Sequence, residues 1–217
     1  MAEQTINPAI EDLYKPLGEI IASGISGEDF DTHFEGHYEW VRGYVIKMSP
    51  ISLRHEQLVD YLRQLLNAYF SLKPIGRVLG DPFQQRIDSI NSRRQPDLQV
   101  ILKTNPGQLT ATAMIGPADI CIEVVSPGTA GKDYGEKFEE YEKGGVKEYW
   151  ILDTERDEYR FYRLNAEGKY KSSSIDDGYY ITSLLPQFKL HVPTLMDKEM
   201  PDFYTIADTV RAMLSQE

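Results

Sequence analysis

The sequence has very little cysteine, no long hydrophobic run and no excess of positive charge. Cys121 is the only cysteine among 217 residues, so an internal disulfide is excluded, and its apolar neighbours predict a small buried core residue. No apolar run approaches the roughly 18 residues that a membrane-spanning helix needs, and residues 1–11 lack the basic-then-apolar order of a signal peptide. We therefore expect an intracellular, cytoplasmic protein that does not enter a membrane.

The charge balance excludes one class of nucleic-acid-binding protein. Lysine and arginine number 23 against 34 aspartates and glutamates, a net charge of −11, which argues against coating nucleic acid by bulk electrostatics. From Lys73 to Lys103 the balance reverses, with six bases and three acids. Arg86, Arg93 and Arg94 lie in this segment and are candidates for holding a phosphate backbone. The alternative is an ordinary solvated face.

The length is sufficient for one domain with a full core. Residues 1–30 predict a loosely docked arm with one short helix around 10–23, and residues 31–217 predict a single domain. Residues 38–46 alternate around Gly43 as in a hairpin. Ser52 is suited to cap a following helix, on which His55 shares the apolar face that points toward the sheet.

The rest of the chain alternates between strand and helix patterns. Strands are predicted at 77–80, 83–88, 97–102, 119–125 and 146–153, a loop at 104–116, a hairpin at 159–164 and 169–175, and helices at 132–143 and 203–214. The apolar run at 119–125 is typical of a central strand covered on both faces. A helix separates it from the strand at 146–153, so those two strands should be parallel. This order predicts an α/β fold with a mixed sheet.

Two carboxylates in these strands are the main functional signal. Alternate strand residues share a face, so Asp119 and Glu123 point the same way, and Asp97 opens the preceding strand directly after a proline. A buried carboxylate is costly without a partner. If the strands pair, Asp97 and Glu123 would converge on one hard cation, and Mg²⁺ (or Mn²⁺) suits a site with few protein carboxylates and several waters.

The helix at 132–143 supplies an amine. Asp133, Lys137 and Tyr141 recur every four residues and therefore lie on one helix face. Lys137 could point back to the sheet, where it would stabilise charge on a phosphate or help to deprotonate a water. The alternative is a surface ion pair between Asp133 and Lys137. Two carboxylates, a cation and an amine are the groups that phosphodiester hydrolysis requires.

Four further side chains are weaker candidates. His55 could contact a metal-bound water or the phosphate, or could be structural. Glu39 is a possible acidic neighbour, although a place on the hairpin surface is the expected one. Asp119 could support Glu123 from the same strand face, and Gln85 could line the site at the sheet edge.

An ordered set of motifs resembles a known family. Pro96-Asp97 followed by Glu123-x-Val125 is similar to the PD-(D/E)xK signature of restriction-endonuclease-like folds. More closely, six motifs between about Tyr38 and His191 resemble the Uma-two family of predicted bacterial endonucleases: Tyr38-Glu39-x-Val41-x-Gly43, His55, Arg94-x-Pro96-Asp97, Ile122-Glu123-Val124-Val125-Ser126-Pro127, Asp133-x-x-x-Lys137-x-x-x-Tyr141 and Gly145-Val146-x-Glu148-Tyr149-Trp150.

The resemblance implies a restriction-endonuclease-like fold, in which helices flank a mixed central β-sheet with extra antiparallel hairpins. It also implies a Mg²⁺-dependent endonuclease acting on nucleic acid, with DNA expected, in which Asp97 and Glu123 bind the metal and Lys137 completes the catalytic set. Position 125, where the superfamily has its lysine, is valine, so the amine is expected from Lys137. Without it, the site would lack its basic member.

Two other functions remain open at this level. One is a non-catalytic module on a nuclease scaffold that binds nucleic acid or protein, which the valine at 125 and the net acidity favour. The other is a phosphohydrolase of small nucleotides. Exposed edge strands and the tyrosine-rich C-terminal hairpin predict a homodimer, which would present two active sites to a duplex.

Overall fold

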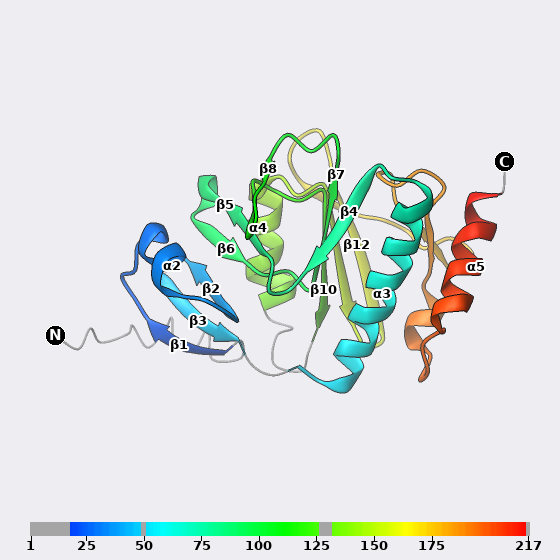
Figure 1. The fold of residues 1–217 in the computed structure, drawn as a ribbon, viewed down its shortest axis with the longest axis horizontal. Coiled ribbons are helices and arrows are strands. Elements are labelled where there is room, and N and C mark those ends of the chain that lie inside the picture. The colour runs from blue at the N-terminus through cyan, green and yellow to red at the C-terminus, as the bar shows by residue number, and fades with distance from the viewer. Residues whose placement is uncertain (1–17, 49–50, 126–131, 216–217) are drawn as a thin grey trace.

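Two β-sheets meet along one short helix in the computed structural model, which describes residues 18–48, 51–125 and 132–215 (Figure 1). The first sheet has the strand order β1-β3-β2-β6-β5-β9-β8. Its strands are β1 (Gly18–Ala22), β2 (Tyr38–Val41), β3 (Tyr44–Met48), β5 (Gln84–Ile87), β6 (Ser92–Arg94), β8 (Gln108–Leu109) and β9 (Ala113–Ile115). We call it the N-terminal sheet because β1, β2 and β3 form one of its edges.

The second sheet, the central sheet, has the order β13-β12-β11-β10-β7-β4. Its strands are β4 (Gly76–Gly80), β7 (Leu98–Leu102), β10 (Ile120–Val125), β11 (Glu148–Asp153), β12 (Glu158–Leu164) and β13 (Tyr170–Ser172). β10 and β11 are parallel and every other neighbouring pair is antiparallel. The predicted mixed sheet and crossover unit are therefore confirmed, and every residue of β10 is buried, as its apolar run predicts.

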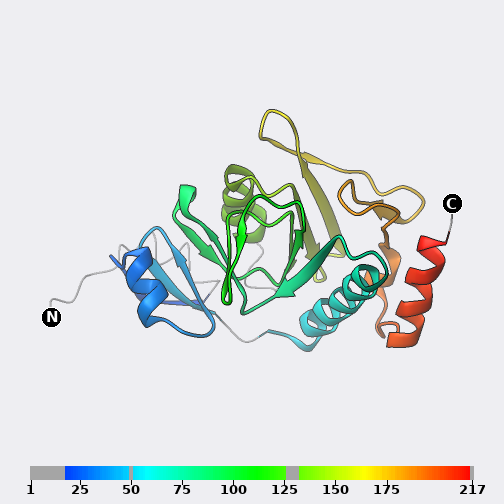
Figure 2. The same ribbon diagram turned by 45° about the horizontal axis from the view of Figure 1, so that its top comes forward.

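Helices cover both faces of the central sheet. α3 (Leu53–Leu72) and α5 (Phe203–Leu214) lie side by side on one face (Figures 1 and 2). α4 (Lys137–Gly144), which continues a π-helical segment at Lys132–Glu136, lies on the other face where the two sheets meet. α2 (Gly27–His33) belongs to the N-terminal sheet. In the parts of the chain that the structure describes, no helix is both long and apolar enough to span a membrane.

The core follows the strand alternation in β10. Ile122 and Val124 pack with α3 and α5, whereas Cys121 and Val125 pack with Tyr141 of α4 on the opposite face. Cys121 is a buried free cysteine, as predicted. Burial of aliphatic side chains contributes about 1.5–3 kcal/mol each relative to exposure. This packing fixes α3 and α4 on opposite sides of the strand that carries Glu123.

The predicted helix cap at Ser52 and the predicted hairpin turn at Gly43 are both confirmed. Ser52 Oγ accepts a hydrogen bond from the His55 amide at 3.1 Å, which caps α3. The β2–β3 hairpin turns at Arg42 and Gly43, both with positive φ (49° and 93°), as a two-residue turn that matches strand twist requires. The C-terminal hairpin of β12 and β13 and the final helix α5 also form as predicted.

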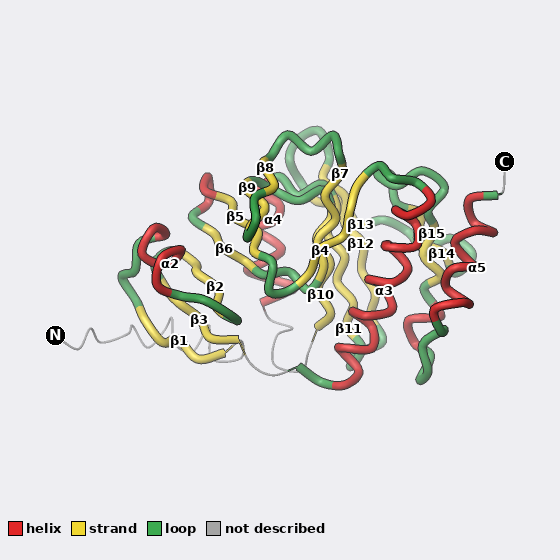
Figure 3. The backbone as a smooth tube through the Cα atoms, viewed as in Figure 1, coloured by secondary structure: helices red, strands yellow, loops and turns green. Residues whose placement is uncertain are grey.

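Several short elements differ from the prediction (Figure 3). The helix expected around 10–23 is wrong for 18–22, which form β1 because they pair with β3; its earlier residues lie outside the described part. The loop expected at 104–116 contains the strands β8 and β9. The strand β6, the two-stranded sheet of β14 (Tyr179–Ile181) and β15 (Lys189–His191), and the 3₁₀ turns Asp88–Ile90 and Pro193–Met196 were not predicted. Each is too short to give a periodic signal.

Candidate active site

The chain crosses from one sheet to the other at Gln95-Pro96-Asp97, between β6 and β7. In the antiparallel pair of β7 and β10, Leu98 is opposite Ile122. Continuing the same register, Asp97, which precedes Leu98, lies opposite Glu123, which follows Ile122. Asp97 Oδ2 accepts a hydrogen bond from the Val124 amide at 2.7 Å. Strand register therefore brings the two predicted carboxylates together.

His55 holds the other oxygen of the same carboxylate. Its Nε2 lies 3.0 Å from Asp97 Oδ1. Burial alone lowers the pKa of His55, but the hydrogen bond and negative charge of Asp97 outweigh burial and raise this pKa above its ordinary value. An ionised carboxylate oxygen can only accept, so His55 Nε2 is the donor in this contact. The structure brings His55 to the site as a partner of Asp97, while its contact with a water or a phosphate stays a prediction.

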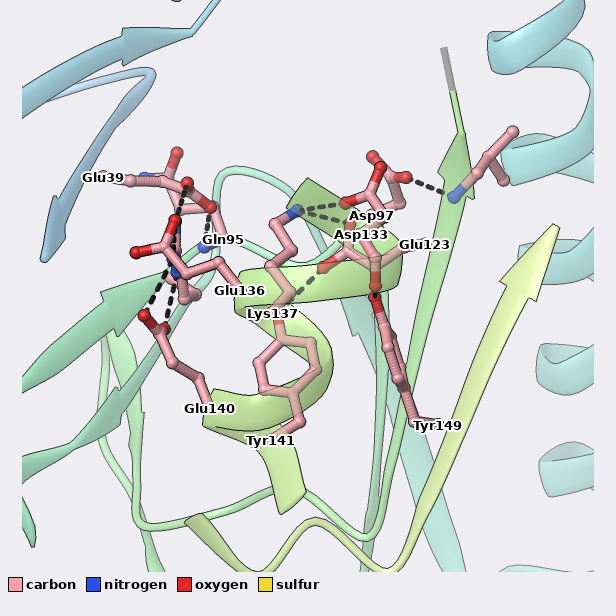
Figure 4. Close-up of polar contacts among 12 residues, drawn as sticks. Glu39, Gln95, Asp97, Glu123, Asp133, Glu136, Lys137, Glu140, Tyr141 and Tyr149 are labelled. Atoms are coloured by element: carbon pink, nitrogen blue, oxygen red, sulfur yellow. Dashed lines mark hydrogen bonds and ion pairs between the residues drawn. The ribbon is translucent and has the colours of Figure 1, made fainter. Parts of the chain in front are cut away.

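Glu123 is held from the helix side (Figure 4). Lys137 Nζ lies 2.8 Å from Glu123 Oε2, and Tyr141 donates its hydroxyl hydrogen to Glu123 Oε1 at 2.8 Å. Asp133 Oδ1 lies 3.3 Å from the same Lys137 nitrogen. Asp133, Lys137 and Tyr141 thus share one helix face, as their spacing predicts. Lys137 is buried rather than on the surface, so the surface ion pair considered above is excluded.

Burial and crowded charges set the protonation of this pair. Burial raises the pKa of Glu123 to about 8; the Lys137 ammonium opposes this shift, and the charges of Asp97 and Asp133 add to it. Burial lowers the pKa of Lys137, but Glu123, Asp133 and further carboxylates outweigh burial and raise it well above its ordinary value. Lys137 therefore favours the ammonium form, which supplies positive charge and hydrogen bonds.

Arg94 of β6 organises a second set of carboxylates. Its guanidinium binds Glu140 through Nε at 2.9 Å and Nη2 at 3.0 Å, and Glu39 through Nη1 at 2.8 Å. Glu136 lies 3.5 Å away. Glu39 also accepts a hydrogen bond from the Gln95 amide at 3.2 Å. The side chains of Arg94, Glu39 and Glu140 are buried, and Glu136 is partly exposed.

Two predictions are corrected by this network. The Arg94 side chain is fully buried, so in this structure it cannot contact a phosphate backbone. Glu39 was expected on the hairpin surface, but it is fully buried as well. It is a neighbour of the site, because its negative charge acts on the pKa of Lys137. Both residues are charged, and charge alone suggested exposure; their mutual pairing is what permits burial.

The helical period explains how side chains of α4 contact residues of both sheets (Figure 4). Glu136 and Glu140, four residues apart, face Arg94 on the N-terminal sheet. Lys137 and Tyr141, also four residues apart, face Glu123 on the central sheet. One turn of α4 therefore carries two polar faces. One face places the Lys137 ammonium beside Glu123, and the other connects the helix to the N-terminal sheet.

Asp119 and Gln85 are not brought to this site. Asp119 accepts hydrogen bonds from the Leu102 amide and the Asn105 side chain, both at 2.8 Å, and its other oxygen lies 2.7 Å from Lys147 Nζ. Four residues along a strand span about 13 Å, so a shared face does not place it near Glu123. The Gln85 carbonyl oxygen accepts from the Ala118 amide at 2.7 Å. Both residues secure the far end of β10.

Arg86 and Arg93 are paired with acids. Asp31 contacts both arginines, and Asp88 lies 2.8 Å from Arg93 and 3.3 Å from Arg86. Arg93 is also stacked over Trp40 and buried, which argues against a direct contact with a phosphate. Arg86, whose side chain is 31% exposed, stays a prediction.

Sequence reasoning missed Asp81. Its carboxylate lies 3.1 Å from His37 Nδ1. Burial raises its pKa; His37 and Lys137 oppose the shift, and the charges of Asp97 and Glu39 add to it. Asp81 is therefore a further acid at the margin of the site. The only sequence signal was its position in the turn between two predicted strands.

The donor set fits a hard divalent cation. Asp97 and Glu123 offer carboxylate oxygens, which Mg²⁺ and Mn²⁺ prefer, and the negative charge that raises the pKa of Glu123 would favour a cation there. Within residues 18–48, 51–125 and 132–215, no group of three or more His, Cys, Asp or Glu side chains is arranged to hold a metal. Waters or a phosphate would have to complete the coordination, as is usual for Mg²⁺.

The raised pKa of Glu123 predicts a pH dependence of stability. A carboxyl group whose folded pKa is about 8, against an ordinary value near 4.3, binds its proton more tightly in the folded state. Its contribution to stability is complete below about pH 4 and is lost as pH rises through 8. Glu123→Gln removes this loss, so relative to wild type the variant should gain about 1–3 kcal/mol of unfolding free energy between pH 5 and 8.

Urea unfolding at several pH values measures this difference. Glu139→Gln is the matched control, because the Glu139 side chain is 67% exposed on the same helix. Parallel stability curves for wild type and Glu123→Gln would refute the assignment of a raised pKa to this carboxyl group.

The Arg94 network predicts a large loss of stability when its cation is removed. Arg94→Met leaves Glu39 and Glu140 buried without their partner, which should cost roughly 3–5 kcal/mol. Arg211→Met breaks an exposed ion pair with Asp208 and should change stability by less than about 1 kcal/mol. Chemical unfolding of the two variants makes the comparison, and an unchanged urea midpoint for Arg94→Met would contradict the structural role.

Comparisons with known proteins identify the family and the fold. A family model described as "Uma2: Putative restriction endonuclease" matches residues 28–193. A similar solved structure is the crystal structure of "a putative nuclease belonging to DUF820" from Anabaena variabilis, with a TM-score of 0.67 and 16% identity over 79% of this chain and 97% of that chain. That likeness confirms the fold, and the comparison with curated proteins gives no match. Because the family model covers most of the sequence, the chain belongs to the Uma2 family of restriction-endonuclease-like proteins.

Proposed function

We propose that this protein is a metal-dependent endonuclease that hydrolyses phosphodiester bonds of nucleic acid, with DNA as its substrate and Mg²⁺ or Mn²⁺ as its cation. Family membership supports a nuclease function. The observation that carries the proposal furthest is the meeting of Asp97, Glu123 and Lys137: a strand pair aligns the carboxylates, and a helix delivers an ammonium 2.8 Å from one of them.

Each of the three side chains has a distinct role in the proposal. Asp97, whose side chain is 18% exposed, and Glu123 would hold the cation. A bound divalent cation supplies Lewis-acid stabilisation of charge on the phosphate and lowers the pKa of a nearby water. Lys137 would donate hydrogen bonds to the charge that develops on the scissile phosphate. Its raised pKa suits this role, because the side chain remains charged throughout the physiological range.

The surrounding contacts support preorganisation of these groups. The Val124 amide and His55 fix the orientation of Asp97. Asp133 lies within 3.3 Å of the Lys137 nitrogen, so the ammonium keeps one anionic neighbour when Glu123 turns to a cation. Groups that are held before the reaction need no reorganisation during it, which is the main source of electrostatic catalysis.

The valine at position 125 is compatible with this proposal. Val125 is buried and packs with the residues that line α4. The amine that the superfamily pattern carries on the strand is supplied here by Lys137, whose nitrogen reaches the Glu123 carboxylate from the helix. This contact favours a nuclease with a relocated lysine over a non-catalytic module that lacks one.

Calorimetric titration with Mn²⁺ or Mg²⁺ tests the metal site. Wild type should bind, and Asp97→Asn and Glu123→Gln should each weaken binding by more than the roughly 10–100-fold that loss of an outer-shell partner costs. Glu139→Gln, an exposed substitution on the same helix, should bind like wild type. Equal affinities in wild type and both site variants would refute Asp97 and Glu123 as ligands.

Cleavage assays with plasmid, single-stranded DNA and free nucleotides identify the reaction. The proposal expects Mn²⁺- or Mg²⁺-dependent cutting of the plasmid by wild type and Glu139→Gln, and loss of cutting in Glu123→Gln. Activity on free nucleotides alone would establish a small-nucleotide phosphohydrolase instead. Metal-independent nucleic-acid binding without cleavage would establish a binding module.

A homodimer belongs to the same proposal, because two sites could then address both strands of a duplex. The edge strands β4 and β13 of the central sheet each have one neighbour, and such edges are available for pairing. Sedimentation at micromolar concentration should give the mass of two chains, and the mass of one chain would remove this part of the proposal.

A further inference from the structure

We propose that Arg63 binds the phosphate backbone of the substrate beside Asp97. The inference rests on the proposed nuclease function and adds a substrate-binding residue to it. Arg63 lies on α3, eight positions after His55, and is partly exposed. None of the motifs that define the family resemblance includes it.

The guanidinium of Arg63 lies against Gly80, the last residue of β4. A β-carbon added to Gly80 would lie 2.6 Å from Arg63 Nη2 and 2.5 Å from the Asp97 carbonyl oxygen. The guanidinium and the backbone of Asp97 therefore converge on the same glycine. Gly80 pairs with Leu98 in the sheet, so the absence of a side chain at this point gives the arginine room next to the residue that would hold the cation.

Arg63 differs from the other bases around the junction of the sheets. Lys137 is paired with Glu123 and Asp133, and Arg94 with Glu39 and Glu140. Among the described residues, the Arg63 guanidinium makes no hydrogen bond or ion pair with the protein. Its donors are therefore available to a ligand.

The charge around the site indicates what that ligand is. Asp81, Asp97 and Glu39 interact electrostatically at this margin, and the chain carries a net charge of −11. A polyanion can approach such a surface only where local positive charge offsets the repulsion. Guanidinium is always charged, and its planar fork matches two phosphate oxygens. The phosphate groups flanking the scissile bond meet these requirements.

Steady-state cleavage of a labelled DNA duplex in Mn²⁺, at a series of salt concentrations, tests the inference. Arg63→Gln should raise KM roughly 10-fold with little change in kcat, since it removes a contact made equally in the ground and transition states. The slope of log(kcat/KM) against log[salt] should become shallower by about 0.9, as expected for one lost phosphate contact. Arg63→Lys keeps the positive charge but loses the planar pair of donors. Its KM and its salt slope should therefore lie between those of wild type and Arg63→Gln.

Arg77→Gln is the matched control. Arg77 is an exposed arginine on β4, and it likewise makes no ion pair within the described residues. This control should match wild type in KM and in salt slope. Thermal unfolding of Arg63→Gln should also match wild type, because the guanidinium has no protein partner there to lose.

The outcomes separate this inference from the proposed function. If wild type cleaves the duplex and Arg63→Gln has the wild-type KM and salt slope, or loses kcat at unchanged KM, the role of Arg63 is refuted and the nuclease assignment stands. If wild type neither cleaves nor binds the duplex, the proposed function fails and the role of Arg63 fails with it.

Discussion

The buried ion pairs of α4 are the constraint on which the site depends. Glu140 binds Arg94 of the N-terminal sheet, and one turn of the same helix carries Lys137 to Glu123 of the central sheet. Desolvating such ions is expensive, and a buried pair often contributes little net stability compared with apolar packing. In this protein the buried pairs mainly restrict the orientation of the helix, because any orientation that left one of these charges unpaired would be highly unfavourable. The position of the Lys137 nitrogen is therefore determined by the contacts of this helix with the N-terminal sheet as well as by its own contacts with the central sheet.

The short crossing from β6 to β7 links the two polar clusters along the chain. Arg94 ends one strand and Asp97 precedes the next, so only Gln95 and Pro96 separate the centre of the structural network from the carboxylate proposed to hold the cation. The intervening Gln95 amide donates to Glu39, which ties the crossing to the hairpin. A shift of either sheet would therefore move Asp97 relative to Glu123. This coupling explains why Arg94-x-Pro96-Asp97 occurs as one motif although its charged members have different surroundings.

The sequence predicts the site best where a fixed period determines the direction of side chains. Strand alternation separates Glu123 from Ile122, and helical spacing groups Lys137 with Tyr141; the structure agrees with both. Periodicity does not indicate distance along an element, and for this reason Asp119 shares a face with Glu123 but lies at the other end of β10. Nor does it indicate burial of charge: Arg94 and Glu39 resemble surface residues until their pairing is known. Asp81 and the shortest strands depend on contacts between distant segments, which a single sequence does not reveal.

The protonation of Glu123 connects this architecture with the proposed chemistry. The pKa of this carboxyl group is raised to about 8, even though an ammonium lies beside it. The reason is that burial and the nearby acids disfavour another negative charge more than Lys137 can offset. The proposed divalent cation would add two positive charges at the same point, so its binding would be thermodynamically linked to release of a proton from Glu123. The same excess of acid that would attract the metal also repels a polyanion. The proposed nuclease would therefore need positive charge outside its metal site, on a side chain that the internal ion pairs leave available.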